Sequence, residues 1–344
     1  MSIVHDQAAD RVIRSVAVNY PLNYALCAAH LALNATALFV LPLLLLPEAS
    51  RALWIVVAIS CTSNGLFAVL HEAIHRSLAP TTRLPVIGIS MNDLLGRIVG
   101  IAFGSPFDFV AIAHVTHHRV NRTPDEHVEV YDQALNVSGR RSLVFGYYCF
   151  LLGGLYAAEM IVPMVCLLPR HLGESLLTRA FAADPMASQV LRRIFRSPYR
   201  FRSIRIDAWI ILASMVASAV LYGHYLWILA IHFLIRAFLI SFLDYLYHYG
   251  SPLGDRLHGY NLRLPRWMSV VILNFNYHGI HHRFPALPWR ALERVFTDQS
   301  LVFDNDYLAQ AVSQLRGPMT RQELERVLKE RRKIESSRTQ RRAD

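Results

Sequence analysis

Four apolar segments of the chain have the length and composition of membrane-spanning helices. Residues 24–46 and 52–70 contain no Asp, Glu, Lys or Arg, and the short stretch 47–51 separates them. Residues 208–222 and 225–243 form a second pair of apolar segments close together in the chain. A helix of about 20 apolar residues crosses the ~30 Å hydrocarbon core of a bilayer. The pattern therefore predicts an all-α integral membrane protein with about four transmembrane helices in two hairpins.

Two further apolar segments are interrupted. Residues 92–113 contain several glycines, Pro106 and Asp108, which are unfavourable in an uninterrupted span, so we expect a re-entrant or interfacial segment. Residues 143–168 are long enough to cross, but arginines flank both ends. Because short basic loops stay on the cytoplasmic side, we expect 143–168 to dip in and return or to lie along the interface. Gly153–Gly154 and Pro163 are the expected bends.

Two polar side chains fall within the last apolar segment. We expect His232 to be a hydrogen-bonded packing residue rather than a ligand. An intramembrane arginine is costly and usually faces a partner or the bundle interior. The two expectations for Arg236 are an ion pair with Asp244 and a position near bound substrate.

Composition supports the membrane assignment. The chain of 344 residues is 53% hydrophobic and 17% charged, and its mean hydropathy is positive. The net charge of +10 indicates basic cytoplasmic loops, above all residues 170–205, rather than a nucleic-acid partner, since arginines are not interleaved with aromatics. The isolated cysteines form no CxxC pair, which argues against a disulfide framework or a thiolate metal site.

Histidines gather in short motifs beside these segments. His71 and His75 are four residues apart, and the two triplets 114–118 and 278–282 place histidines at i, i+3 and i+4. Residues at these spacings lie on one face of a helix. His248 follows Asp244 by one helical turn at the end of residues 225–243. Neutral imidazole is the commonest protein metal ligand.

Two returning hairpins would place all of these histidines on one side of the membrane. Nine imidazoles are too many for one metal ion but suit two ions with open positions, and an all-nitrogen site favours iron. The predicted ligands are His71, His75, His114, His117, His118, His248, His278, His281 and His282. We expect a cytoplasmic helical cap to carry this site. Two redox metals beside a membrane suggest O₂ activation and attack on a C–H bond of a lipid-like substrate.

An alternative hypothesis is that His71-Glu72-Ala73-Ile74-His75 is the HExxH helix of an intramembrane zinc peptidase, with Glu72 as the base. This hypothesis leaves seven of the clustered histidines without a role. One zinc per chain would favour the peptidase, and two irons would favour the oxidase.

The spaced histidine boxes resemble those of the membrane fatty acid desaturase superfamily, the histidine-box di-iron proteins, which include alkane hydroxylases and carotenoid ketolases or hydroxylases. The resemblance covers roughly residues 50–295, and His248 corresponds to the family's additional histidine. Asp244 stands where the family has an asparagine that can hold a metal-bound water, and Tyr247 stands where it has a glutamate. The resemblance implies Asp244 as a candidate catalytic residue.

The resemblance further implies a di-iron, O₂-dependent fatty acyl or lipid desaturase that introduces a double bond by hydrogen abstraction. Hydroxylase, ketolase and acetylenase activities on an acyl, alkane or carotenoid-like substrate use the same site and stay open. Glu72, Asp125 and Glu126 are candidates to hold the ligands. Since the chain contains no recognisable redox domain, an external donor of the ferredoxin, rubredoxin or cytochrome b5 type is implied.

The resemblance also sets the expected organisation of the chain. Residues 1–317 would form a single membrane desaturase-like domain, and residues 318–344 a charged, partly disordered tail. We expect the protein in membrane lipid, in the bacterial inner membrane, with the active site on the cytoplasmic side.

Overall fold

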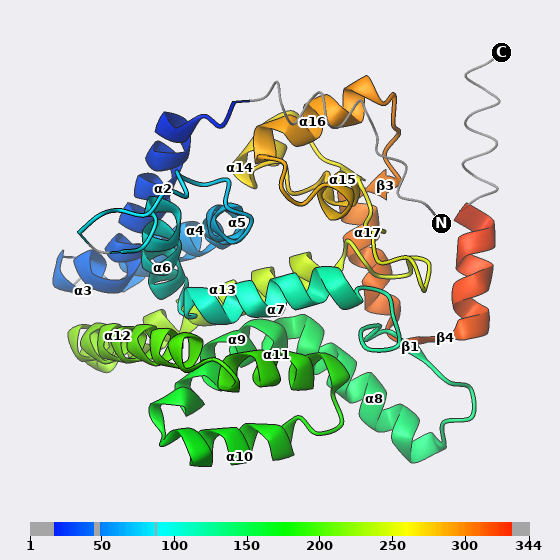
Figure 1. The fold of residues 1–344 in the computed structure, drawn as a ribbon, viewed down its shortest axis with the longest axis horizontal. Helices are drawn as coiled ribbons and strands as arrows, with labels where there is room; N and C mark the ends of the chain where they lie inside the picture. The colour runs from blue at the N-terminus through cyan, green and yellow to red at the C-terminus, as the bar shows by residue number, and fades with distance from the viewer. Residues whose placement is uncertain (1–16, 45–48, 87, 332–344) are drawn as a thin grey trace.

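A computed structural model describes residues 17–44, 49–86 and 88–331, and within these residues the protein is mostly helical (Figure 1). The expected loop at residues 47–51 lies partly outside the described residues, as do residues 332–344 of the predicted tail. The α-helices within the apolar stretches long enough to cross a membrane, or within the bent pair α6–α7, are α2 Tyr20–Ala35, α3 Leu41–Leu44, α4 Ala49–Ser60, α5 Ser63–Ile74, α6 Met91–Phe103, α7 Phe107–Val120, α8 Val137–Cys149, α9 Leu155–Met164, α12 Pro198–Tyr222 and α13 Leu226–Tyr245.

Further α-helices and two pairs of short strands lie outside these stretches. The α-helices are α10 Arg170–Ala180, α11 Pro185–Phe195, α14 Arg266–Val271, α15 His278–Arg283, α16 Trp289–Asp298 and α17 Tyr307–Ser313. Two parallel pairs of short strands join distant segments: β1 (Val130–Tyr131) pairs with β4 (Met319–Thr320), and β2 (Leu262–Arg263) with β3 (Asn305–Asp306). Helices α8, α10 and α11 lie on the opposite side of α7 from α14 to α16 (Figure 1).

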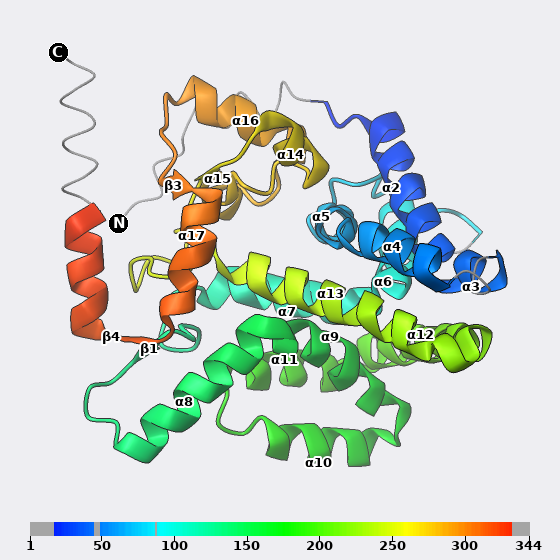
Figure 2. The ribbon, with the colours of Figure 1, turned by 180° about the vertical axis from the view of Figure 1, so that it is seen from behind.

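Four helical stretches in the described residues are long and apolar enough to cross a membrane, which confirms the predicted fold class. They are Tyr20–Leu44, Arg51–Ile74, Val137–Leu167 and Pro198–Tyr245. The last stretch contains both predicted helices of the second hairpin, α12 and α13, divided at Gly223 with φ 50° and ψ −122°. Seen from behind, α13 crosses the middle of the molecule between α17 and α12 (Figure 2).

The stretch Val137–Leu167 also has the length and apolar composition of a span, so our expectation that it returns to the same side stays a prediction. Its chain bends at Gly153, where φ is 146° and the helical path breaks, as predicted. Pro163 lies in the last turn of α9, and a 3₁₀ turn follows at Val165.

Helices α6 and α7 are bent by 97° against each other, which confirms the predicted interruption. Gly104 occupies the left-handed region at φ 97°, which suits glycine because it has no Cβ. A Cβ on Gly100 would lie 2.8 Å from the carbonyl oxygen of Ser105, so the turn needs glycine there as well. The Tyr156 hydroxyl donates to the carbonyl of Phe103 and fixes the end of α6. The bend determines where α7 carries its histidines.

Arg236 is 2% exposed and stabilises the same bend. Its guanidinium donates to the carbonyls of Ala102 and Phe103 at 3.2 and 3.3 Å. It also donates to Asn34 Oδ1 and, at 3.3 Å, to Ser63 Oγ. The expected ion pair with Asp244 is therefore wrong, because carbonyls at the C-terminus of α6 and polar side chains of neighbouring helices take its donors.

His232 is a packing residue, as predicted. It is 1% exposed, and its Nδ1 lies 2.8 Å from Ser60 Oγ on α4.

A buried ion pair in the segment after α7 forms hydrogen bonds to the end of α13 and to the segment that follows it. Arg122 and Glu129 are 2% and 0% exposed, and Arg122 donates to both carboxylate oxygens at 2.7 and 3.0 Å. Glu129 also accepts from the Tyr245 hydroxyl and, at 3.1 Å, from the Gly250 amide. Arg122 donates in addition to the Ser251 carbonyl at 2.7 Å. These bonds hold the segment that carries His248 against the end of α7.

The described part of segment 318–344 packs on the same region. The amide of Met319 donates to the Glu129 carbonyl at 2.7 Å, and Leu324 is 2% exposed. The domain boundary at residue 317 stays a prediction.

Replacing Glu129 by alanine should destabilise the fold strongly, because it leaves the Arg122 charge buried without its partner. Loss of one member of a buried pair costs about 3–5 kcal/mol. We expect the unfolding temperature of the detergent-solubilised protein to fall by several degrees. The matched control is Glu293→Ala, which removes the exposed pair with Arg266 and should cost at most about 1 kcal/mol. Equal effects of the two substitutions would contradict the proposed importance of the buried pair.

Candidate metal centre

All nine predicted histidines come together in two neighbouring groups. The end of α5 provides His71 and His75, and α7 provides three histidines on its last two turns. His248 lies in the turn that follows α13, and the short helix α15 provides the remaining three. The ligand nitrogens within each group lie within 4.8 Å of one another. The predicted convergence is therefore present in the fold.

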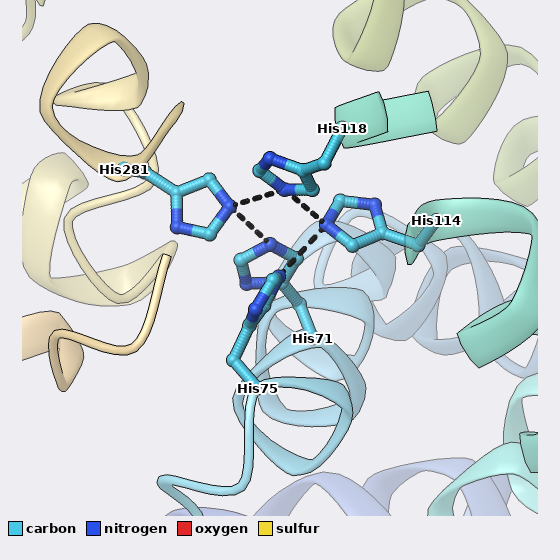
Figure 3. A group of neighbouring side chains, drawn as sticks. All are labelled: His71, His75, His114, His118 and His281. Atoms are coloured by element: carbon cyan, nitrogen blue, oxygen red, sulfur yellow. Dashed lines mark hydrogen bonds between the residues drawn. The ribbon is translucent and has the colours of Figure 1, made fainter. Parts of the chain in front are cut away.

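The first group contains five histidines from three helical segments (Figure 3). Its members are His71, His75, His114, His118 and His281. Figure 3 shows their rings turned toward one centre, with dashed lines between the Nε2 atoms. These separations are 2.9 Å for His75–His114, 3.0 Å for His114–His118, 3.0 Å for His118–His281 and 3.1 Å for His71–His281.

The second group contains four histidines, again from three segments. Its members are His117, His248, His278 and His282. Nε2 of His278 lies 3.0 Å from Nε2 of both His248 and His282, and the His117–His282 separation is 3.4 Å. The two spatial groups divide the sequence motifs. His117 belongs to the second group, whereas His114 and His118 of the same motif belong to the first. In the last motif, His281 belongs to the first group, and His278 and His282 belong to the second.

These distances fit metal ligation. Ligands about 2.1 Å from a metal ion and at right angles to one another are separated by about 3.0 Å, and metal–imidazole bonds have this length. The donor set consists of imidazole nitrogens alone. Burial, together with the neighbouring imidazoles, holds the pKa of His248, His278, His281 and His282 well below the usual value for histidine. These rings are therefore neutral near pH 7, which is the form that binds metal.

Groups behind the histidines orient their rings. The Glu126 carboxylate lies 2.7 Å from His117 Nδ1, as expected of a residue that holds a ligand. The other two residues expected to hold a histidine ligand bind different side chains. Asp125 accepts a hydrogen bond from Gln189 at 2.8 Å, and Glu72 accepts one from Ser77 at 2.6 Å.

Asn121 was missed by the sequence analysis. Its side-chain amide is 3.4 Å from His282 Nδ1 and donates to the carbonyls of Arg256 and His258 at 3.1 and 2.9 Å. In the sequence, Asn121 is a polar residue three positions after His118. No spacing rule distinguishes such a residue from the polar residue of an ordinary helix end.

A cavity of about 590 Å³ reaches both groups. His114 of the first group and His117, His248 and His278 of the second contribute to its lining, together with Asp244. Such a volume is typical of a small-molecule site. His127 also lines the cavity but belongs to neither histidine group, and its Nδ1 lies 2.8 Å from the Thr123 carbonyl.

Aromatic side chains cover the centre. Tyr247 stacks on His278 with ring centroids 4.5 Å apart, and Phe275 contacts His71 and His278 at 4.8 Å each. Tyr247 is 1% exposed. At the position where the resemblance led us to expect a glutamate, the chain thus supplies an apolar surface that excludes water from one side of the histidine centre.

The fold and the site together define a helical membrane protein with a paired histidine centre able to bind metal. The chain belongs to the fatty acid desaturase family, whose model matches residues 49–301. Membership makes the protein an oxidoreductase of the desaturase and hydroxylase type, from a family known for di-iron use and fatty acyl substrates. Comparisons with curated proteins and with solved structures found no match.

Removing the carboxylate that holds His117 should weaken metal binding. We expect Glu126→Ala to lower the affinity of the second group by about 10–100-fold, because ligands that lose their orienting partner bind metal less tightly. Competition with a chelator measures this change. Asp125→Ala is the matched control, since Asp125 is adjacent in sequence and bonds to Gln189 rather than to a histidine. An Asp125→Ala loss as large as that of Glu126→Ala would refute the assigned role.

Proposed function

We propose that the protein is a membrane-bound, O₂-dependent di-iron fatty acyl or lipid desaturase. The observation that carries the proposal is the division of nine histidines into two adjacent all-nitrogen groups. Two adjacent groups suit a pair of metal ions, and nitrogen donors without thiolates suit iron. The proposed ligands are the five histidines of the first group and the four of the second. Iron would supply the capacity to reduce O₂ and to abstract hydrogen from a methylene carbon.

The protein's own residues would prepare this chemistry. The apolar part of the cavity, which includes Val110, Leu143 and Phe150, would hold the hydrocarbon chain. Tyr247 and Phe275 would keep water away from the reacting carbon atoms. Glu126 would fix the ring of His117 in one orientation.

Asp244 is the proposed catalytic carboxyl group. It lines the cavity beside His117 and His248, and it is close enough to His117 to interact with it electrostatically. A carboxyl group in this position can hold a proton and release it next to the reacting carbon atoms.

The contacts of Glu72, His71 and His75 do not support the alternative hypothesis of a zinc peptidase. Glu72 would have to face a metal-bound water as the base, but its Oε2 accepts hydrogen bonds from Ser77 and from the Trp289 amide. His71 and His75 lie among five converging histidines rather than beside one further ligand. Hydroxylase, ketolase and acetylenase activities share the proposed centre, and the product distinguishes them.

Electrons would come from an external donor of the ferredoxin, rubredoxin or cytochrome b5 type. The surface proposed for its docking is the basic region of α10, α11 and the start of α12. Arg193 on α11 donates to Thr116 of α7, which lies between the histidines of that helix. We place this surface and the active site on the cytoplasmic side of the bacterial inner membrane, by the distribution of basic loops.

Mass spectrometry of lipids tests the reaction. Cells that express the protein should accumulate an acyl product that is two hydrogen atoms lighter than its substrate and contains no added oxygen, because desaturation releases the oxygen as water. The matched control is His248→Ala, which removes one proposed ligand. A product that retains an oxygen atom from ¹⁸O₂ would contradict desaturation in favour of hydroxylation.

The Asp244→Asn variant tests the catalytic carboxyl group. Asparagine keeps the size and polarity of the side chain but cannot take up a proton. We expect metal content to stay unchanged while turnover falls by about 100-fold or more, the usual contribution of general acid–base catalysis. Unchanged turnover would show that Asp244 has no part in proton transfer, and lost metal would show a structural role instead.

A further inference from the structure

A second carboxyl group, Glu159, lines the same cavity as the histidines. It belongs to α9, and Asp244 belongs to α13, so the two acids come from different helices. They are close enough to interact electrostatically. Neither the metal centre nor the proposed chemistry uses Glu159.

Glu159 has no partner that would explain its position. Its Oε2 atom is buried and forms no hydrogen bond to any described residue. The nearby Ser105 hydroxyl donates to the Glu159 backbone carbonyl at 2.7 Å and not to its side chain. The guanidinium of Arg236, a buried cation on α13, is directed to Asn34 and to the end of α6. A buried carboxyl group without a hydrogen bond costs free energy unless a ligand provides one.

The rest of the lining makes the cavity acidic. Besides Glu159 and Asp244, the carboxyl groups of Asp125, Glu126 and Asp184 contribute to its wall. Among the described residues that line the cavity, Arg122 is the only arginine, and Glu129 pairs with it. A carboxylate or phosphate that entered the cavity would therefore meet this acidic wall and, among the described lining residues, no arginine without a partner.

We propose that Glu159, together with Asp244, selects a lipid chain that carries a hydroxyl group on the part that enters the cavity. A hydroxyl group donates to an ionised carboxylate and also accepts from a protonated one, so it satisfies Glu159 in either state. An unsubstituted methylene at the same place leaves the carboxyl group unpaired. The inference rests on the proposed function, because it names the substrate class of that site, and it makes Glu159 a specificity-determining residue.

Equilibrium binding to the purified full-length protein tests the inference with two radiolabelled probes of equal chain length, 1-hexadecanol and hexadecane. The wild type should bind the alcohol about tenfold or more tightly than the hydrocarbon, which can neither donate nor accept a hydrogen bond. Equal affinity for the two probes would overturn the inference.

Variants assign the preference to one side chain. Glu159→Leu should abolish the preference for the alcohol, and Glu159→Gln should retain it, because the amide also donates and accepts hydrogen bonds. Glu174→Leu, a substitution on the exposed part of α10, is the matched control and should bind both probes like the wild type. If Glu159→Leu does not fold, the same comparison with Glu159→Ala decides the question. An unchanged preference for the alcohol in a folded apolar variant of Glu159 would overturn the inference.

The binding assay contains no reductant, so its result does not depend on turnover. A protein that selects the alcohol but yields neither unsaturated product nor bound iron would refute the proposed function and leave the role of Glu159 standing. A protein that forms the unsaturated product but does not distinguish the probes would refute only the role of Glu159.

Discussion

The structure depends on nine imidazoles whose ring nitrogens face one another in the interior of the protein. Nitrogen atoms about 3 Å apart repel one another through their lone pairs unless a proton or a cation lies between them, and burial disfavours protonation. Metal ions resolve this conflict, since each accepts several lone pairs at once. Metal binding is therefore coupled to folding, because the histidines converge only when α5, α7 and α15 are packed.

Several otherwise unrelated features serve this convergence. The 97° bend between α6 and α7 directs the histidines of α7 toward those of α5, and Arg236 and Tyr156 fix that bend by binding the carbonyl groups at the end of α6. The buried pair of Arg122 and Glu129 fixes the segment of His248 to the end of α7. Polar groups inside the apolar region thus act mainly as positioning residues for the centre.

The apolar runs made the membrane region predictable, because a bilayer imposes length and composition on each helix. Glycines also indicated the breaks in the helices at Gly104 and Gly153, because the backbone there adopts φ angles that other residues avoid. The partners of Arg236 were not predictable: Asn34 and Ser63 lie far away in the chain and only tertiary packing brings them near. The membership of His117 and His118 in different groups was not predictable either, because it depends on how α7 turns toward the other helices.

The metal content of the purified full-length chain tests the central claim most directly. Two groups of histidines predict two irons per chain, and a substitution confined to the second group, His282→Ala, should reduce the content toward one while the first group keeps its ion. One zinc per chain, insensitive to His282→Ala and lost on substitution of His71 or His75, would contradict the account.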